Sequence, residues 1–164
     1  MRRTSRLLLR HAVDADARFI VELLTDPDFV RFIGDRGVRD EQTALGYIAK
    51  LRASYQTNGF GLYVVSTPDG DALGLCGLVR RDTLPQPDLG FAFLPRARGH
   101  GYAREAALDS LKEAAELGIH QLLAICNEDN VSSRKLLEAI GFRFGGLTRL
   151  KDGAEDLCLY SRGR

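Results

Sequence analysis

The stretch Asp88-Leu-Gly-Phe-Ala-Phe-Leu-Pro-Arg-Ala-Arg-Gly-His-Gly-Tyr-Ala-Arg-Glu105 decides the fold of this chain. An alternating, strand-like segment runs into a turn rich in arginine and glycine, and that turn opens into a helix rich in alanine and leucine. Gly99 and Gly101 carry no Cβ, so a ligand can approach the backbone closely. The next N–H groups begin the helix, where they have no intrahelical acceptor and lie at the positive end of its dipole. The segment therefore predicts an anion site. Three arginines add positive charge around it: Arg96, Arg98 and Arg104.

The turn fits neither common nucleotide-binding motif. A P-loop requires Gly-Lys-Ser/Thr at the start of the helix, whereas this chain has Gly101-Tyr-Ala-Arg104. A dinucleotide fingerprint requires a third glycine where Arg104 stands. A plain strand-to-helix turn with solvated arginines is the remaining alternative, and an NTP-binding regulator is disfavoured.

A second block follows further along the chain: Asn127-Glu-Asp-Asn-Val-Ser-Ser-Arg-Lys-Leu-Leu-Glu-Ala-Ile-Gly-Phe142. Together the two blocks resemble the GNAT superfamily of acetyl-CoA-dependent N-acetyltransferases. The Arg98 to Ala103 loop is similar to the family's pyrophosphate loop, Arg/Gln-x-x-Gly-x-Gly/Ala. The second block is similar to the Asn-x-x-Asn-x-x-Ser-x-x-Leu-x-x-x-x-Gly-Phe signature of the RimJ/RimL-like branch.

Length and composition are consistent with one soluble domain. The 164 residues are enough to bury about two thirds of the unfolded surface without disulfides or metals, so we expect a single domain over 1–164. A net charge of +1 gives no reason to expect nucleic acid, and no apolar run approaches membrane-spanning length. Cys76, Cys126 and Cys158 lie in apolar segments, which favours a reducing, cytoplasmic location and no metal site.

The pattern along the chain predicts a mixed α/β (α+β) fold. The strand-like segments are 7–10, 62–67, 72–80, 88–94, 121–126, 142–149 and 154–161, and the helical segments are 14–24, 40–55, 101–117 and 130–140. Pro27 marks the end of the first helix. The resemblance implies a mostly antiparallel sheet of about six to seven strands, about four helices and a splayed central strand pair. It also implies that the strand containing Gly90 bulges and that the pantetheine arm lies beside it.

The resemblance implies a cofactor site around the turn and the second block. Backbone groups of Phe91, Phe93 and Leu94 are expected to face the pantetheine arm. Asn130 resembles the asparagine that binds the pantetheine amide, and it is also a good helix N-cap. The remaining residues expected to contact acetyl-CoA, the last of them at its 3′-phosphate, are Arg96, Arg98, Gly99, His100, Gly101, Tyr102, Ala103, Ser133 and Arg134.

The catalytic candidates are Ser133 and Asp88. Ser133 resembles the serine near the sulfur, which can donate a hydrogen bond to the departing thiolate. Asp88 stands where the branch often has a glutamate that acts as a base through water, although a solvated carboxylate after Pro87 is the alternative. Many superfamily members place a tyrosine acid one helical turn after the serine, where this chain has leucines. Glu105 is expected to be structural, because an acid in the first turn stabilises a helix.

The sequence thus indicates a monomeric or homodimeric enzyme that transfers acetyl from acetyl-CoA to a primary amine by direct attack. A protein N-terminal α-amine and a small amine both remain open as acceptors. The segments Arg31–Arg36 and Leu147–Glu155 are expected to border the acceptor pocket. A non-catalytic acyl-CoA-binding module is the alternative function.

Overall fold

The computed structural model describes residues 1–163 of the chain. Its α-helices are α1 (Ala17–Thr25), α2 (Pro27–Phe32), α3 (Glu41–Asn58), α4 (Tyr102–Glu116) and α5 (Val131–Ala139), with 3₁₀ turns at Asp14–Asp16 and Pro95–Ala97. Its strands are β1 (Arg2–Arg3), β2 (Leu8–Arg10), β3 (Leu62–Ser66), β4 (Ala72–Val79), β5 (Asp88–Phe93), β6 (Gln121–Cys126), β7 (Arg143–Thr148) and β8 (Leu157–Gly163).

The strands form one open sheet in the order β1-β2-β3-β4-β5-β6-β8-β7. Every neighbouring pair is antiparallel except β5 and β6, which are parallel. The expected mixed α/β fold is confirmed, with eight strands and five α-helices in residues 1–163. The additional strand is β1, whose two arginines carry no apolar alternation. The additional helix is α2, because Pro27 occupies its first turn instead of only ending α1.

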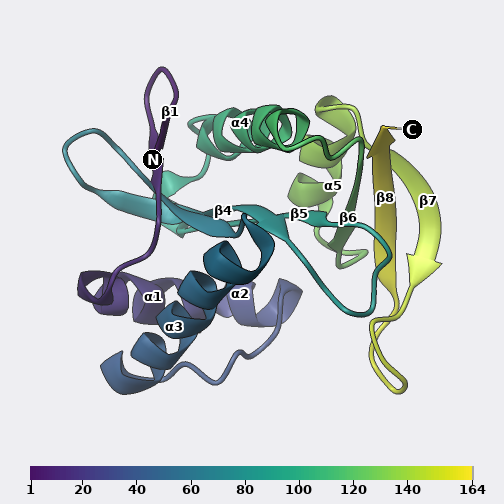
Figure 1. The fold of residues 1–164 in the computed structure, drawn as a ribbon. Coiled ribbons are helices and arrows are strands. Elements are labelled where there is room, and N and C mark those ends of the chain that lie inside the picture. Colours follow the sequence, from purple (N-terminus) through teal and green to yellow (C-terminus); the bar gives the residue numbers. More distant parts are fainter. Residues whose placement is uncertain (164) are drawn as a thin grey trace.

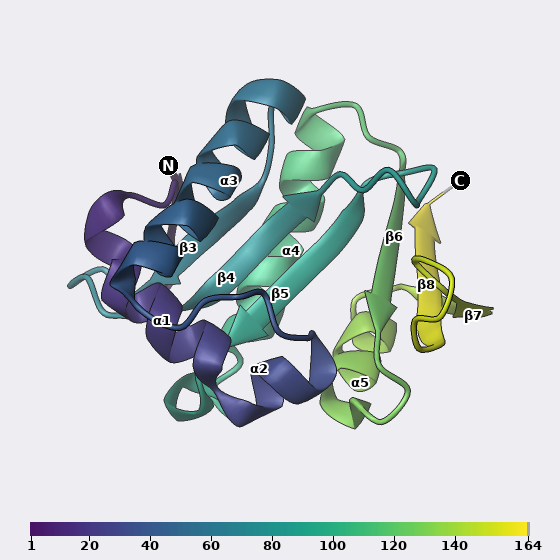
Figure 2. The same cartoon turned by 90° about the horizontal axis from the view of Figure 1, so that it is seen from below.

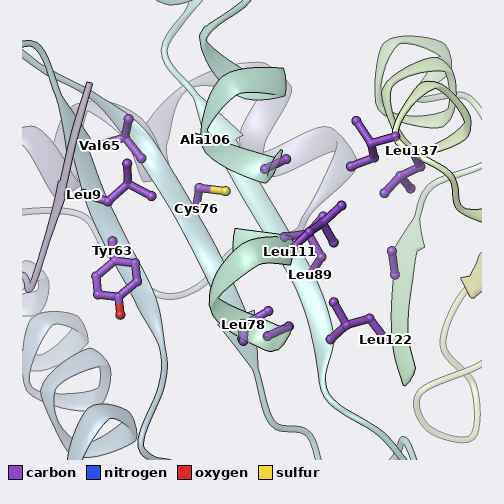
Figure 3. Close-up of a cluster of buried hydrophobic side chains, with 14 of the residues drawn as sticks. Leu9, Tyr63, Val65, Cys76, Leu78, Leu89, Ala106, Leu111, Leu122 and Leu137 are labelled. Carbon is purple, nitrogen blue, oxygen red and sulfur yellow. The ribbon is translucent and has the colours of Figure 1, made fainter. Parts of the chain in front are cut away.

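The helices cover both faces of the sheet. Figure 1 shows α4 and α5 on one face and α1, α2 and α3 on the other. The core on the α4 side includes Leu89, Leu111 and Leu137, which meet between the sheet and the helices (Figure 3). The opposite core joins Ile20 and Ile48 to the other face of the sheet. Two apolar layers therefore hold the central strands in place.

Side-chain caps and left-handed glycines set the helix boundaries. The Asp40 carboxylate accepts from the Thr43 N–H at 2.9 Å, and Gly59 ends α3 with φ of 78°. The Asn130 side chain accepts from the Ser133 N–H at 3.4 Å at the start of α5. The expected cap at Asn130 is therefore present in the structure.

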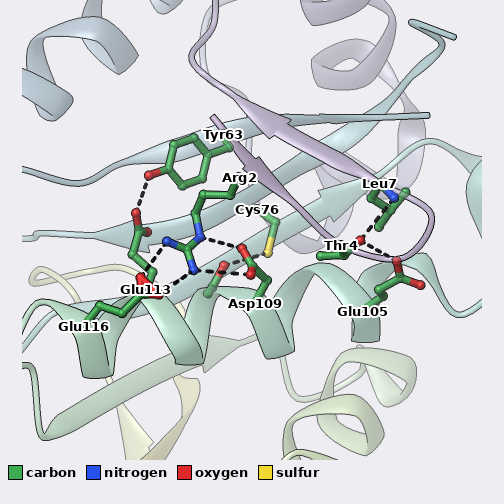
Figure 4. Close-up of polar contacts among 10 residues, drawn as sticks. Arg2, Thr4, Leu7, Tyr63, Cys76, Glu105, Asp109, Glu113 and Glu116 are labelled. Carbon is green, nitrogen blue, oxygen red and sulfur yellow. Dashed lines mark hydrogen bonds and ion pairs between the residues drawn. The ribbon is translucent and has the colours of Figure 1, made fainter. Parts of the chain in front are cut away.

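The N-terminal strand is tied to α4 by charged side chains. Arg2 donates to Asp109 at 2.6 Å and to Glu116 at 2.8 Å (Figure 4). Beside it, the Tyr63 hydroxyl donates to the buried carboxylate of Glu113. Glu105 accepts from the Thr4 hydroxyl and from the backbone and guanidinium of Arg6. The carboxylate of Glu105 thus has structural partners, in agreement with the role expected for it.

The sheet splits between its two parallel strands. Within residues 1–163, β5 and β6 share one Cα pair, Asp88 with Leu123, next to a 3.0 Å hydrogen bond from the Leu123 N–H to the Pro87 carbonyl. Beyond that pair the strands diverge (Figure 2). The expected splay is therefore observed. The expected bulge at Gly90 is wrong, because β4 and β5 keep an uninterrupted register and Gly90 lies opposite Gly77.

Candidate active site

Two adjoining cavities occupy the region where β5 and β6 diverge. The larger cavity has a volume of about 620 Å³ and the smaller about 370 Å³. They share lining residues from α2, β5 and α5, namely Phe29, Phe32, Ile33, Phe91, Ala92, Asn130 and Ser133. Because the same residues line both, the two cavities lie next to each other at the split in the sheet, and together they are called the cleft.

The N-terminus of α4 opens on the smaller cavity. Gly99 and Gly101 have φ of 80° and 79°, a left-handed conformation that glycine adopts without strain. Gly101 is the N-cap of α4 and provides no side-chain cap, so the first N–H groups of the helix have no intrahelical acceptor. Gly101, Tyr102 and Ala103 line the cavity. This end of the cleft is suited to an anion.

The guanidinium of Arg98 is engaged by protein groups. It lies 2.6 Å from the Asp28 carboxylate and 3.4 Å from that of Asp26, and it donates to the Phe93 carbonyl at 3.1 Å. Arg98 and Asp28 both line the smaller cavity. Arg98 therefore links the glycine loop to the beginning of α2 while it remains at the cavity wall.

Two other predicted loop residues lie outside both cavity walls. Arg96 pairs with Asp71 at 3.0 Å, and the exposed His100 accepts from Arg6 through its carbonyl at 2.9 Å. Arg104 does line the smaller cavity, and within residues 1–163 no carboxylate lies within ion-pair distance of it. From the sequence, Arg104 is recognisable only as additional positive charge. Whether a carboxylate pairs with it depends on where the acidic residues lie in the folded chain.

The exposed edge of β5 contributes Phe91 and Phe93 to the smaller cavity. Leu94 is buried in the core on the α3 side, and its N–H donates to the Leu73 carbonyl at 2.9 Å. The backbone of Leu94 is thus occupied by a neighbouring segment. Of the three positions expected to face a ligand, the two phenylalanines lie in the cleft.

The beginning of α5 lies where the two cavities meet. Asn130 and Ser133 line both, while Leu136 lines the smaller cavity and Leu137 the larger. The Arg134 guanidinium is directed elsewhere: it donates to the Tyr160 hydroxyl at 3.0 Å and lies over the Phe144 ring. The cleft therefore has a hydroxyl at its centre, and leucines follow it one turn later.

Asp88 is the buried carboxylate of the larger cavity. It is 1% exposed and lies 3.1 Å from the Arg81 guanidinium. Burial raises the pKa of Asp88 from 3.8 to about 6, although the positive charge of Arg81 opposes this shift. The carboxylate is thus mostly ionised near neutral pH and can still take up a proton.

The outer wall of the larger cavity comes from both predicted border segments and from α3. Phe32, Ile33 and Arg36 belong to the first segment, and Leu150 belongs to the second. The sequence did not predict the contribution of α3, which includes Tyr47, Lys50, Leu51 and Ser54. No motif marks these residues, because helical spacing alone does not say which neighbour a helix faces.

Comparisons with known proteins agree with this arrangement. The family description "Acetyltransferase (GNAT) domain" matches residues 6–143. The uncharacterized N-acetyltransferase YnaD of Bacillus subtilis (strain 168) is 26% identical over 144 residues, covering 87% of this chain and 82% of that protein. The structure of an acetyltransferase from Agrobacterium tumefaciens str. C58 has a TM-score of 0.85 and 25% identity, covering 99% of this chain and 94% of the other. The RimL ribosomal L7/L12 α-N-protein acetyltransferase in complex with coenzyme A has a TM-score of 0.73 and 15% identity, covering 98% and 95%.

The fold and the comparisons together define the class of protein. A mixed sheet that splits between parallel strands, with a helix N-terminus at the split, is the fold of the acetyltransferases matched above. The chain belongs to the GNAT acetyltransferase family and is an acetyl-CoA-dependent enzyme. The resemblance to this superfamily is thus confirmed, and the likeness to RimL is one of fold. No helix within residues 1–163 is both long and apolar enough to cross a membrane.

Proposed function

We propose that this protein transfers an acetyl group from acetyl-CoA to a primary amine by direct attack of the amine. The observation that carries the proposal is the placement of three features on one cleft: the open N-terminus of α4, the Ser133 hydroxyl and the Asp88 carboxylate. Acetyl-CoA supplies the activated acetyl group as a thioester. The protein must bind and align the two reactants and remove a proton from the amine.

The smaller cavity fits the anionic part of acetyl-CoA. The N–H groups at the start of α4 favour a diphosphate, and Arg104 adds a cation that has no carboxylate partner in residues 1–163. The divergence of β5 from β6 leaves the β5 edge without its parallel neighbour after Asp88. We assign the pantetheine arm to this edge, with Asn130 as its polar partner on α5.

Asp88 is the proposed general base. A pKa of about 6 keeps the carboxylate ionised at neutral pH, and Asp88 lies at the start of the split and lines the larger cavity, to which we assign the acceptor. It would accept the proton directly or through one water. The positive charge of Arg81 favours the ionised form of the carboxylate. Both residues line the larger cavity.

Ser133 is the proposed donor to the departing sulfur. Its hydroxyl stands at the junction of the cavities, and the residues one helical turn later are Leu136 and Leu137. A neutral hydroxyl assists mainly by hydrogen bonding to the thiolate as negative charge develops. The amine, after losing its proton, keeps the acetyl group, and the sulfur leaves as the thiolate or thiol.

A non-catalytic acyl-CoA-binding module is the alternative, and the leucines after Ser133 are the observation that favours it. Calorimetry and a free-thiol assay with a panel of amines distinguish the two. Both functions predict binding of CoA, but only the enzyme releases thiol from acetyl-CoA when an amine is added. CoA binding without amine-dependent thiol release would contradict the proposed transfer. A protein N-terminal α-amine and a small amine are both tested as acceptors.

A further inference from the structure

The charged residues of the larger cavity are strongly unbalanced. Its wall contains four cationic side chains and a single carboxylate, Asp88. The cations are Arg36, which follows α2, Lys50 on α3, and Arg80 and Arg81, which follow β4. Arg81 pairs with Asp88, which leaves three cations around one cleft.

These three cations have no carboxylate partner. Within residues 1–163, no acid lies within ion-pair distance of Arg36, Lys50 or Arg80. In the β7–β8 hairpin, Glu155 accepts from Asn127 and Asp156 accepts from Arg149. The cleft therefore has a positive field that its own residues do not neutralise.

Tyr47 lines the same cavity as these cations. Burial raises the pKa of the Tyr47 phenol, and the guanidinium groups of Arg36 and Arg81 act in the opposite direction. Both arginines line the cavity together with Tyr47, although they come from different segments. Arg81 is one of the four cations of this wall, and it lies 3.1 Å from the proposed base, Asp88.

The rest of the wall is apolar. Phe29, Phe32, Leu62, Leu78 and Leu150 line the same cavity. An acceptor that fills the cleft must therefore combine an apolar portion with a group that the cations stabilise. Polycationic amines do not satisfy this condition, because their additional ammonium groups would meet like charges.

We infer that the acceptor is a small primary amine that carries an anionic group close to its nitrogen together with an apolar side chain, as an apolar α-amino acid does. Arg81 lies 3.1 Å from Asp88 and Arg80 lines the same cavity, so a carboxylate adjacent to the reacting amine would lie near cations while the amine faces the base. The same positive field favours the neutral form of the amine, which is the nucleophile. A peptide N-terminus lacks this carboxylate because it is part of the next amide.

This inference rests on the proposed transfer to an amine, and the test separates the two. Thiol release from acetyl-CoA is measured with phenylalanine, phenylalaninamide, phenethylamine and a peptide that begins with phenylalanine and contains no acidic residue. These acceptors share the apolar body and differ in the carboxylate. We expect kcat/KM for phenylalanine to exceed that for each of the others by about tenfold or more. The amide is a stringent comparison, because its amine is less basic and more easily kept neutral.

Variants test whether the cationic wall causes the preference for phenylalanine over acceptors that lack its carboxylate. Arg80→Gln and Lys50→Gln are each expected to lower the ratio of kcat/KM for phenylalanine to kcat/KM for phenylalaninamide about three- to tenfold. Arg52→Gln is the matched control, because Arg52 is an exposed residue of α3 outside both cavity walls. High salt should also reduce the preference, since these cations are exposed to solvent.

Equal or better turnover of phenethylamine, the amide or the peptide would overturn the inference and leave the acetyltransferase proposal intact. CoA binding with no acetylation of any amine would instead contradict the proposed function. In that case, binding of N-acetylphenylalanine and N-acetylphenethylamine to the CoA complex still decides the question. Tighter binding of the acid supports an anion-binding wall, and equal binding refutes it.

Discussion

Replacing Asp88 with asparagine tests whether this buried carboxylate titrates near neutral pH. Burial raises the pKa of Asp88 from 3.8 to about 6, against the opposing charge of Arg81. The folded protein therefore binds this proton more tightly than the unfolded chain does. The stabilisation from the protonated group is fully present below the unfolded pKa and is lost as the pH rises through about 6.

The two pKa values set the size of the effect. They give a loss of about 1.4 kcal/mol in the free energy of unfolding between about pH 5 and about pH 8. Asp88→Asn lacks this proton, so the unfolding free energy of the variant minus that of the wild type should rise by that amount over this interval. Urea titrations at both pH values measure the difference. The cost of leaving Arg81 without its carboxylate is the same at both and cancels.

The exposed Asp82 provides the control. Asp82→Asn should give a pH dependence of stability parallel to that of the wild type, since the carboxylate of Asp82 is exposed and has no ion-pair partner in residues 1–163. If the curves for Asp88→Asn and the wild type are also parallel, Asp88 does not titrate with a raised pKa, and the electrostatic reasoning about the site is refuted.

Activity provides a second measurement on the same variant. If Asp88 is the base, protonation of its carboxylate should lower kcat/KM for the acceptor about tenfold for each pH unit below about 6, in addition to the loss caused by protonation of the acceptor amine. Asp88→Asn should lose this limb and about 10²- to 10⁴-fold in rate. Deprotonation of the acceptor amine adds a limb at higher pH that both proteins share. A variant with full activity and an unchanged acid limb would remove Asp88 from the mechanism.

Three further predictions follow from other parts of the structure. Gly101→Val places a side chain at φ of 79° and blocks the start of α4, so calorimetry should show CoA affinity weakened about tenfold or more. Gly70→Val, in a surface turn at φ of 96°, should reduce stability without changing that affinity. Ser133→Ala should lower kcat about tenfold or more and leave CoA binding unchanged; full turnover would exclude the hydroxyl from the reaction. Tyr63→Phe removes the donor to the buried Glu113 and should cost about 1–3 kcal/mol in urea unfolding, whereas an unchanged midpoint would show that the pair contributes nothing.

Local signals in the sequence predicted most element boundaries. Asp40 and Asn130 begin helices because their side chains accept from exposed N–H groups, and Gly59 ends one because it adopts a left-handed conformation. These interactions span a few residues, so the sequence contains them directly. Local signals were insufficient at Pro27, where the same residue can end one helix or begin another. Asp26 decides the outcome because its carboxylate accepts from the Phe29 N–H at 3.4 Å.

The candidate site was predicted in part for the same reason. The glycine loop and the beginning of α5 are continuous motifs, and the structure brings them to one cleft. The partners of the loop arginines could not be read from the sequence, because Arg98 meets Asp28 across 70 positions and Arg96 meets Asp71 across 25. The strand that contains Gly90 also lacks the bulge that was expected in it. Its pairing depends on β4, which local composition does not describe.

The sequence by itself predicted the order of the strands and helices apart from β1 and α2, the glycine loop that opens α4, and the resemblance to the acetyltransferase family. Short-range capping, glycine conformations and apolar periodicity indicate the elements, and two continuous motifs indicate the family. Only the tertiary structure decided that Asp88 is buried beside Arg81 and that Arg36, Lys50 and Arg80 gather around one apolar cleft. The charge and pKa of a site depend on distances between residues far apart in the chain, and packing of the sheet against its helices sets those distances.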